Sequence, residues 1–275
     1  MWCLYVKIGR LLFQTGVFMK KILCLILSVF IAFSAFGQIK NVDEYRARKI
    51  DFYCEKDFDK VVNMIGNELS LLQQNKSSYS EELFITLENM LYVDQLFFSL
   101  EHNELPESKK AHFKEIFLAQ EKKSEDFMGK RDYEEMSSNF LLSVGDIKCQ
   151  MPFVISIPAS IPKLTKAKSF YDNAVVNDPK NCAALISQSL WYMHSPGISG
   201  GSKKKSYKII QEAEKTVRIP SDRFFVLIFK GQIEESLKKI DQCKITLKTA
   251  HNLYPNETFT AIVAENLNLD LDFLK

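Results

Sequence analysis

Two segments of the chain each contain four residues at the same set of spacings, and this repeated pattern constrains the fold more than any other feature. A small residue is followed by a large apolar one four positions on, an alanine three further and a proline five further. The two sets are Ala167, Tyr171, Ala174 and Pro179, and Cys243, Leu247, Ala250 and Pro255. Steps of four and three place the first three side chains on one helical face, and the proline ends the helix. Because small residues there let a neighbouring helix approach closely, the pattern predicts packed helices.

Composition supports an all-α fold. The 275 residues include 21 Phe and 10 Tyr but only 10 Gly and 8 Pro, a balance that favours long, well-packed helices over a turn-rich β fold. The length suits one large or two modest domains, although repeat folds escape this count because each unit packs mainly on its neighbours.

Residues 1–37 have the character of a targeting segment. A basic pair is followed by the apolar run ILCLILSVFIAF and then by small residues at the two positions that a signal peptidase reads, Ala35 and Gly37. This order predicts a signal peptide over 19–37 that is cleaved before Gln38, and hence a periplasmic or otherwise exported protein.

Residues 1–18 fit poorly ahead of such a signal, which normally begins at its basic pair. We therefore expect Met19 to be the true start and Met1 a mis-called one, although the sequence leaves both open. An uncleaved N-terminal membrane anchor is the alternative to cleavage, but the apolar run is short for a spanning helix.

The net charge of the chain limits which classes of partner it can bind. Removing residues 1–37 leaves 32 Lys and Arg against 34 Asp and Glu, so the formal net charge moves from +2 to −2. A near-neutral chain without a long basic stripe argues against nucleic acid as a partner.

Four cysteines follow the targeting segment: Cys54, Cys149, Cys182 and Cys243. An exported chain permits disulfides, and four cysteines allow three full pairings, which the sequence leaves open. None lies in a CxxC or at a metal-like spacing. Cys243 occupies a small-residue packing position, where a buried free thiol is expected. No cysteine follows the apolar run closely enough to accept a lipid.

Apolar residues at steps of three and four predict helices in the first half of the chain. They cover 42–74, with a possible break near Lys56 and Asp57, then 81–102, a helix from Pro106, and 132–149. Ser80 is expected to cap the second of these. Pro152, Pro158 and Pro162 then predict a loop, or a short helix and a turn, with a strand possible at 153–157. We expect this proline-rich segment to be the clearest internal boundary.

The second half is predicted to contain a series of shorter helices. They cover 163–176, 181–194, a helix capped by Ser202, a short helix 221–231 ended by Gly231, a long helix 233–253 and a last one over 257–273. Pro179, Pro220 and Pro255 lie 41 and 35 residues apart, close to the period of a helical solenoid.

The repeated set resembles the second helix of tetratricopeptide repeats (TPRs). Both sets match position for position, with Cys243 in place of the first alanine, and a looser middle unit has Ser206, Ile210 and Ala213 in register. The Trp-Leu-Gly-Tyr signature of the first helix is missing. The resemblance implies irregular TPR-like helix pairs over 145–275 in a right-handed solenoid, packed on an N-terminal helical segment over 38–144.

The run DPKNCAALISQSLWYMHSPGISGGSKKKSY is similar to the periplasmic T-component proteins of TRAP-type transporters. That resemblance implies a helical-repeat protein that docks a solute-binding receptor. Members of that family often carry a lipid-accepting cysteine, which this chain lacks.

Groove-facing positions follow from TPR geometry. The first helix after Pro179 would present Asn181, Ala184, Gln188 and Trp191 to the concave groove, and Tyr192 adjoins them. Large aromatic residues dominate binding hot spots, so we predict that Asn181, Gln188, Trp191 and Tyr192 bind a partner. Alternatively, Trp191 or Tyr192 packs against the neighbouring repeat.

The sequence gives no support for a catalytic site, a metal site or a cofactor. The four histidines show no ligand spacing, and Ser202 and Lys203 begin a helix without the glycines of a phosphate-binding loop. Lys203, Lys204 and Lys205 are expected to form a solvated helix end or to attract an acidic partner. We therefore expect a non-enzymatic scaffold that binds another protein. A carrier of a small or lipid-like hydrophobic ligand is the alternative, and an enzyme comes third.

Overall fold

The computed structural model describes residues 38–102, 104–129 and 131–274, and residues 39–275 form one compact unit. The predicted targeting segment, residues 1–37, lies outside the described residues. Within them the regular structure is helical, and one isolated bridge joins Glu101 and Glu104. No helix in this described part is both long and apolar enough to cross a membrane.

Four helices form the N-terminal part of the unit: α2 (Val42–Cys54), α3 (Phe58–Gln74), α4 (Glu81–Phe98) and α5 (Glu107–Met128). The predicted break near Lys56 and Asp57 is confirmed, because the Asp57 carboxylate accepts a hydrogen bond from the backbone N–H of Lys60 and so caps α3. Ser80 caps α4 in the same way through Leu83 N. The helix predicted over 81–102 ends four residues early, at Phe98.

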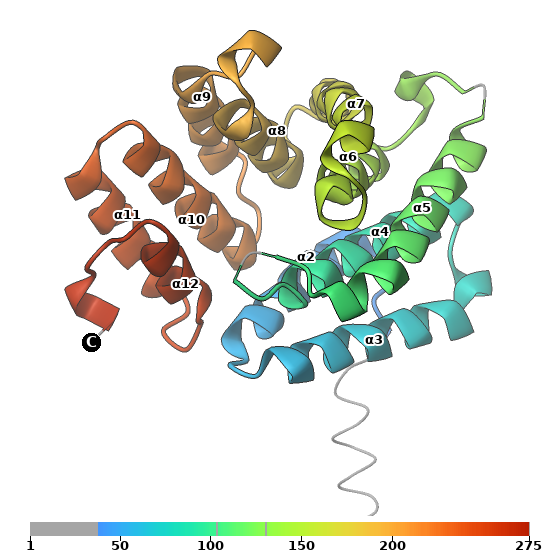
Figure 1. The fold of residues 1–275 in the computed structure, drawn as a ribbon, viewed down its shortest axis with the longest axis horizontal. Coiled ribbons are helices and arrows are strands. Elements are labelled where there is room, and N and C mark those ends of the chain that lie inside the picture. The colour runs from blue at the N-terminus through green and yellow to red at the C-terminus, as the bar shows by residue number, and fades with distance from the viewer. Residues whose placement is uncertain (1–37, 103, 130, 275) are drawn as a thin grey trace, which may run out of the picture. The chain divides into compact units, whose positions relative to one another are not determined.

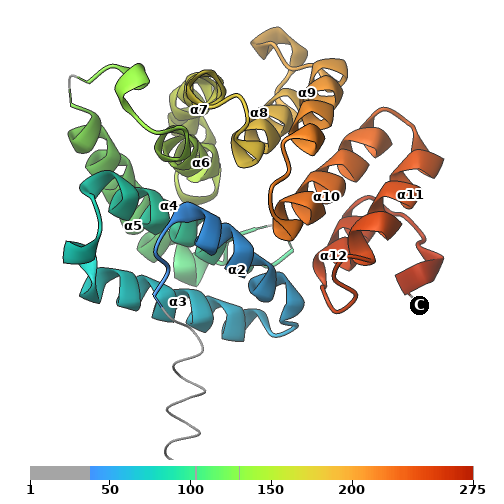
Figure 2. The same ribbon diagram turned by 180° about the vertical axis from the view of Figure 1, so that it is seen from behind.

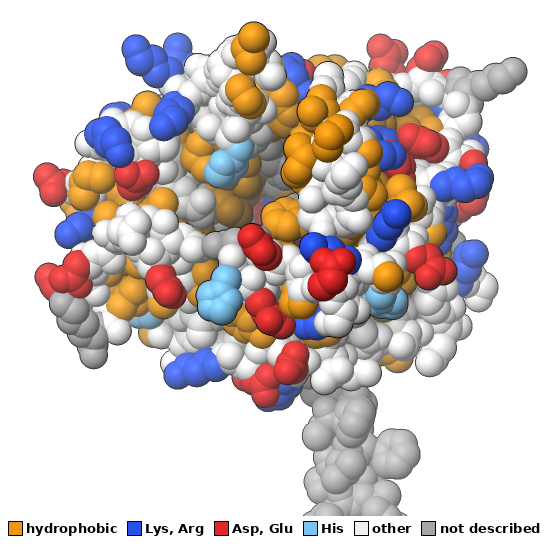
Figure 3. Space-filling model, viewed as in Figure 1, with side chains coloured by type: hydrophobic (Ala, Val, Ile, Leu, Met, Phe, Trp, Pro, Cys, Tyr) orange, Lys and Arg blue, Asp and Glu red, His pale blue; other side chains and the backbone are white. Residues whose placement is uncertain are grey.

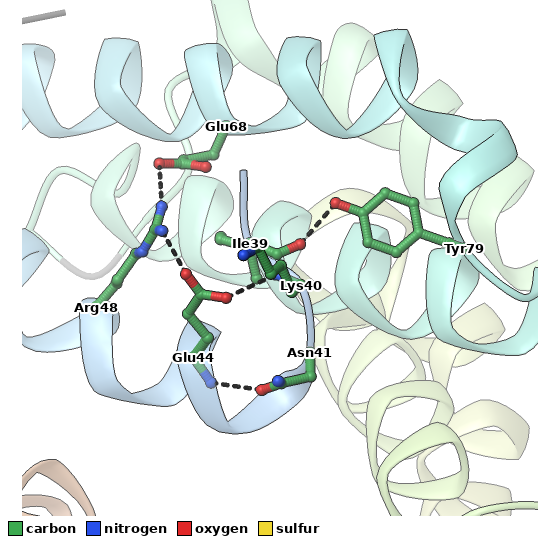
Figure 4. A network of polar contacts seen from close by, with 7 residues as sticks. All are labelled: Ile39, Lys40, Asn41, Glu44, Arg48, Glu68 and Tyr79. Atoms are coloured by element: carbon green, nitrogen blue, oxygen red, sulfur yellow. Dashed lines mark hydrogen bonds and ion pairs between the residues drawn. The ribbon is translucent and has the colours of Figure 1, made fainter. Parts of the chain in front are cut away.

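A polar network fixes the start of α2 (Figure 4). Asn41 Oδ1 accepts from Glu44 N at 2.9 Å, and Glu44 Oε2 accepts from Lys40 N at 2.8 Å. This resembles a capping box, except that the second donor is the residue before the N-cap. Arg48 bridges Glu44 to Glu68 of α3. The Tyr79 hydroxyl donates to Ile39 O at 2.6 Å. The segment just before α2 is thereby tied to α3 and to the turn before α4.

Three helix pairs follow and then a short helix. The pairs are α6 (Ser138–Val154) with α7 (Ile157–Asn177), α8 (Cys182–His194) with α9 (Lys203–Lys215), and α10 (Pro220–Ser236) with α11 (Ile240–His251); the short helix is α12 (Phe259–Asn266). Within each pair the two helices pack along each other, and Figures 1 and 2 show the pairs following one another side by side. The chain is therefore an all-α helix-pair repeat, as predicted. The expected boundary after residue 144 falls inside α6.

The repeated residues form the packing faces of α7, α9 and α11. Each of the nine side chains at the three spaced positions is buried: Ala167, Tyr171, Ala174, Ser206, Ile210, Ala213, Cys243, Leu247 and Ala250. This confirms that the sequence repeat marks where the second helix of each pair contacts its neighbours.

The proline-rich segment is mostly helical, so the loop or strand expected there is wrong, but the helix is interrupted there, as expected. Pro152 lies in the last turn of α6, Pro158 in the first turn of α7 and Pro162 one turn further, so the helices break only at Ile155 and Ser156. A proline in the first turn loses no hydrogen bond, because the N–H groups there have no partner within the helix.

The long helix expected over 233–253 is interrupted. Lys239 N bonds to Glu234 O at 2.8 Å and Lys238 N to Glu235 O at 2.7 Å, with Lys238 in the left-handed region at φ 63°. These are the two bonds of a Schellman motif, which ends α10. Gly231, which was expected to end a helix, lies inside α10. The final helix is also shorter than predicted, covering Phe259–Asn266 only.

One apolar core joins the N-terminal helices to the repeats. It runs from Ile39 to Leu271 in the sequence, and α2 packs on both α4 and α10. Ring contacts at this junction include Tyr53 with Phe225 at 5.1 Å and with Phe259 at 4.8 Å between centroids. A smaller cluster lies among α4, α5 and α6. Helix α2 is therefore placed against α10, the first helix of the third pair.

Candidate functional site

A cavity of about 220 Å³ lies among α2, α4, α6, α8 and α10. Figure 3 shows a hollow in the surface where α6, α8 and α10 meet, with hydrophobic side chains on its rim and walls. Two larger hollows, of about 390 and 420 Å³, lie elsewhere and are lined mainly by charged, largely exposed side chains around Lys56 and Lys122. We take the first as the candidate site because apolar walls and a few converging polar groups typify binding sites.

Helical spacing brings the lining residues together. Each contributing helix presents one face to the cavity, and the lining residues of a helix lie one, three or four positions apart in the sequence. The set comprises Tyr45, Arg46, Lys49 and Tyr53 of α2; Met90 and Val93 of α4; Leu142, Asp146 and Gln150 of α6; Ala183, Ile186, Ser187 and Leu190 of α8; and Asp222, Phe225 and Phe229 of α10. The site therefore draws on the first helix of every repeat pair.

Lys49 is held beside the cavity by one carboxylate and several rings. Its Nζ lies 2.6 Å from Asp94 Oδ1, while the Tyr45 hydroxyl donates to Asp94 Oδ2 at 2.5 Å. The same ammonium lies 5.6 Å from the ring centroid of Phe225 and 6.0 Å from that of Tyr53, within the range of cation–π attraction. Burial, and then the neighbouring Asp94, raise the pKa of Tyr45 well above its usual value, so its hydroxyl stays a donor.

Arg46 forms the second charged pair. Its Nη2 lies 2.6 Å from Asp222 Oδ1, and both side chains are largely buried. Burial raises the pKa of Asp222, and Arg46 opposes that rise. The pair joins α2 to α10 directly beside the cavity.

Asp146 is the third acid of the site. Its Oδ1 accepts hydrogen bonds from the Tyr171 hydroxyl at 2.9 Å and from Ser187 Oγ at 3.2 Å. Burial raises its pKa from 3.8 to about 6; Tyr171, Lys49 and Ser187 lower it, and Asp94 adds a smaller rise. This carboxyl group therefore changes its charge near neutral pH, which few aspartates do.

The four predicted partner-binding residues lie outside the cavity wall. The α8 residues on the wall are Ala183, Ile186, Ser187 and Leu190, and three of them come one position before the predicted Ala184, Gln188 and Trp191. One residue corresponds to about 100° of helix rotation, so the cavity lies beside the α8 face that was predicted to bind a partner.

Two of those residues make interior contacts. Asn181 is buried, caps α8 through Ala184 N, and donates to Ser138 Oγ at 2.9 Å and Asn139 Oδ1 at 2.8 Å. Tyr192 is also buried, and its hydroxyl accepts from Lys205 Nζ at 2.6 Å.

The other two lie between α7 and α8 and are partly exposed. Gln188 donates to Asp172 Oδ1 at 2.8 Å, and Trp191 packs edge-on against Tyr192 with centroids 5.3 Å apart. Lys168 Nζ lies 5.6 Å from the Trp191 ring. A role for these two in partner binding stays a prediction.

The residues that sequence reasoning missed come mainly from α2, α6 and α10. No repeat signature marks Lys49, Asp146 or Phe225, because they are brought together by packing between helices far apart in the sequence. One signal was available: α6 carries Leu142, Asp146 and Gln150 at steps of four, and Asp146 is the one acidic residue of that helix.

Metal-ligand groups and cysteine thiols are the remaining candidates for chemistry among the described residues. They contain no group of three His, Cys, Asp or Glu side chains that could hold a metal ion. The cysteines at 54, 149, 182 and 243 are free thiols, and burial raises the pKa of Cys149 and Cys182 to about 12 and of Cys243 to about 11. These three thiols are protonated at neutral pH and so are weak nucleophiles.

Comparison with known proteins identifies the fold. The chain is similar to the crystal structure of TTC0263, a thermophilic TPR protein in Thermus thermophilus, with a TM-score of 0.52 and 10% sequence identity. The alignment covers 83% of this chain and 100% of that one. No protein-family profile and no curated protein sequence matches the chain. The fold is therefore that of a TPR-like helical repeat.

Proposed function

We propose that this protein is a non-enzymatic scaffold that binds a partner protein in the hollow formed by α2, α6, α8 and α10. The observation that carries the proposal is the cavity of about 220 Å³, to which the first helix of all three pairs contributes. Stacked helix pairs create extended concave surfaces of this kind. Polar groups of Lys49, Asp146 and Gln150 on an otherwise apolar wall supply the directional contacts that specific binding needs.

A scaffold fits the cavity better than a carrier does. Pockets that enclose drug-sized ligands occupy about 300–1,000 Å³, so this cavity is too small to enclose a lipid chain. The Phe-rich interior is filled by its own rings: Phe97 and Phe98 pack on Tyr53, and Phe259 packs on Phe97 and Phe229. A single side chain projecting from a partner matches the volume that is left.

The partner is a solute-binding receptor of a transport system in the periplasm. Support comes from the signal-like segment over 19–37 and from the likeness of the α8–α9 region to T-component proteins, in particular Asn181, Trp191 and the run Gly200-Gly201-Ser202. Export and receptor docking form the finer part of the proposal.

The test is affinity capture with the full chain, tagged at its C-terminus and expressed in a bacterium with a periplasm. Ala183→Phe fills the cavity from α8 and is expected to reduce capture by tenfold or more. Val176→Phe is the matched control, because Val176 is 68% exposed on α7 and outside the cavity. Trp191→Ala probes the partly exposed surface between α7 and α8.

Circular dichroism must first show equal helicity in all variants. Loss of capture with Ala183→Phe but not Val176→Phe supports the proposed hollow, and mass spectrometry of the captured protein then tests the receptor assignment. Loss of capture with Trp191→Ala alone would show that the partner binds at the surface between α7 and α8 and not in the hollow. Capture that is unaffected by every substitution would contradict the proposal.

A further inference from the structure

Three carboxylates and two basic side chains gather at or beside the cavity: Asp146 and Asp222 of its wall, Asp94 of α4 next to it, and Lys49 and Arg46. Lys49 Nζ is paired with Asp94 at 2.6 Å, and Arg46 Nη2 is paired with Asp222 at 2.6 Å. Asp146 lies in the same wall but forms no ion pair with any described residue. Each basic group thus has its own acid, and Asp146, although Lys49 lowers its pKa, has no ion pair of its own among the described residues.

One oxygen of Asp146 is also without a hydrogen-bond donor. Both bonds to this carboxylate, from Tyr171 and Ser187, end on Oδ1. Among the described residues none donates to Oδ2. Asp146 is partly exposed in the cavity wall, and a carboxylate with limited access to water is stabilised by further donors, most of all by a cationic one. The open position at Oδ2 therefore fits an N–H group that carries positive charge.

The remaining walls suit the body of such a group. Tyr53, Phe225 and Phe229 supply aromatic surface, and Ile186 and Leu190 supply aliphatic surface on the α8 side. Aromatic faces attract cations, as the position of Lys49 over the Tyr53 and Phe225 rings already shows. A volume of about 220 Å³ equals roughly seven water-sized groups, enough for an ammonium with a short chain.

We propose that this cavity binds an organic ammonium cation, with the charged nitrogen on Asp146 and a short apolar chain against Tyr53 and Phe225. The inference rests on the proposed function, because it assigns the chemistry that the same cavity recognises. The cation is either the lysine side chain of a partner protein or a free alkylamine, and both present the same group to Asp146.

Three four-carbon probes of matched size test the charge preference: n-butylammonium, 1-butanol and butyrate, each titrated into the full chain by NMR. Asp146→Asn keeps the shape and the acceptor for Tyr171 and Ser187 but removes the charge. Asp172→Asn is the matched control, because Asp172 bonds to Lys168 and Gln188 outside the cavity. We expect wild type to prefer butylammonium over butanol by about tenfold or more, a charged hydrogen bond being stronger by that much. Asp146→Asn should abolish this preference, and Asp172→Asn should keep it.

The pH dependence gives a second readout. Butylammonium stays protonated between pH 5 and 8, so a change in its affinity over this range must come from the titration of a group in the protein. Asp146 gains its charge as the pH rises through about 6, so butylammonium should bind more tightly at pH 7 than at pH 5. The charged and titratable groups that face Asp146 from the surrounding helices are Tyr45, Lys49, Asp94, Cys149 and Tyr171, and the raised pKa of Tyr45 keeps it neutral here. Burial raises the pKa of both Cys149 and Tyr171, so they stay neutral here, and Asp146→Asn should bind independently of pH.

Two peptide probes separate the two sources of the cation. Nα-acetyl-lysine methylamide should bind more tightly than butylammonium if the natural ligand is a lysine of a partner, and more weakly if it is a free amine. Acetylating its Nε should abolish binding in either case.

Several results would overturn the inference: butanol binding as tightly as butylammonium, a preference for butyrate, or unchanged binding by Asp146→Asn. If any of these occurs while Ala183→Phe still blocks partner capture, the ammonium assignment fails and the scaffold stands. If butylammonium binds as expected but no partner is captured, the scaffold fails and the cation site stands.

Discussion

The Tyr171 ring lies directly against Gly145, so close that a β-carbon on Gly145 would come within 2.6 Å of Tyr171 Cε1. The same relationship recurs in the third helix pair, where a β-carbon on Gly231 would lie 2.8 Å from Leu247 Cδ2. Tyr171 and Leu247 occupy the same position of the repeated sequence pattern. The large residue of the second helix therefore packs on a glycine of the first helix, which is what lets the two helices approach closely.

Replacing these glycines by alanine should destabilise the fold. Gly145→Ala forces the buried Tyr171 ring away from its place, so we expect the free energy of unfolding to fall by about 1–3 kcal/mol, the usual cost of overpacking. Gly231→Ala meets the flexible end of Leu247 and should cost less. Urea denaturation followed by circular dichroism measures both.

Gly66→Ala is the matched control for this pair. Gly66 lies inside α3 with nothing within 4 Å of a built β-carbon. Because alanine favours a helix over glycine by about 1 kcal/mol, this substitution should stabilise the protein. Equal effects of the three substitutions would show that packing against Tyr171 and Leu247 is unimportant.

The second helices of the repeats were predictable because their signal is local. Small and large residues at steps of four and three are read directly from 164–179 and 240–255, and each of those positions is buried. The first-helix glycine was harder to recognise. Gly145 stands 26 residues before Tyr171, whereas Gly231 stands only 16 residues before Leu247. In the middle pair the first helix has a serine in this role, Ser189, which bonds to Ser206. Without a fixed spacing, the glycine positions could not be aligned.

The wrong helix boundaries have a common cause. The end of α10 uses Lys238 in a left-handed conformation that glycine usually adopts, whereas the glycine nearby, Gly231, serves packing. The end of α12 uses Asn268 in the same way at φ 52°. Residue type alone does not show which of two roles a glycine plays. The cavity was likewise beyond sequence reasoning, because it depends on where α2 docks.

Lys148 is a buried cation whose loss should be costly. It is 1% exposed, with Nζ 2.7 Å from Glu121 Oε1 and 2.9 Å from Glu125 Oε1. Lys148→Met leaves Glu121 buried with only Lys163 as a partner, so we expect a loss of about 3 kcal/mol in the free energy of unfolding. Urea denaturation at pH 7 measures this loss.

The double variant Lys148→Met with Glu121→Gln should recover part of that stability, because no uncompensated charge is then buried. Lys122→Met, on the exposed face of α5, removes only a solvated pair with Asp126 and should change stability by less than about 0.5 kcal/mol. A similar loss for Lys122→Met and Lys148→Met would refute the view that burial makes Lys148 important.

The proposed export predicts where the mature chain begins. Expressed in a bacterium with a periplasm, the chain should be recovered from that compartment with the mass of residues 38–275, because cleavage is expected before Gln38. Gly37→Pro, at the residue before the cleavage site, should leave the precursor uncut. A protein that keeps residues 19–37 and stays with the membrane fraction would instead support the uncleaved anchor.

The raised pKa of Asp146 makes stability depend on pH in a defined direction. In the unfolded chain this carboxyl group titrates near 3.8, and in the folded protein near 6, so the folded state holds the proton more tightly. Its contribution to stability is therefore full below pH 3.8, falls as the pH rises to about 6 and is constant above that. A shift of about two units corresponds to roughly 3 kcal/mol. Asp146→Asn does not titrate, so its stability relative to wild type should rise by about that amount between pH 4 and pH 7, as measured by urea denaturation at each pH. A difference that stays constant across this range would mean that Asp146 is already charged at pH 4, and its carboxylate would then need a counter-charge that the ion pairs of Lys49 and Arg46 do not supply.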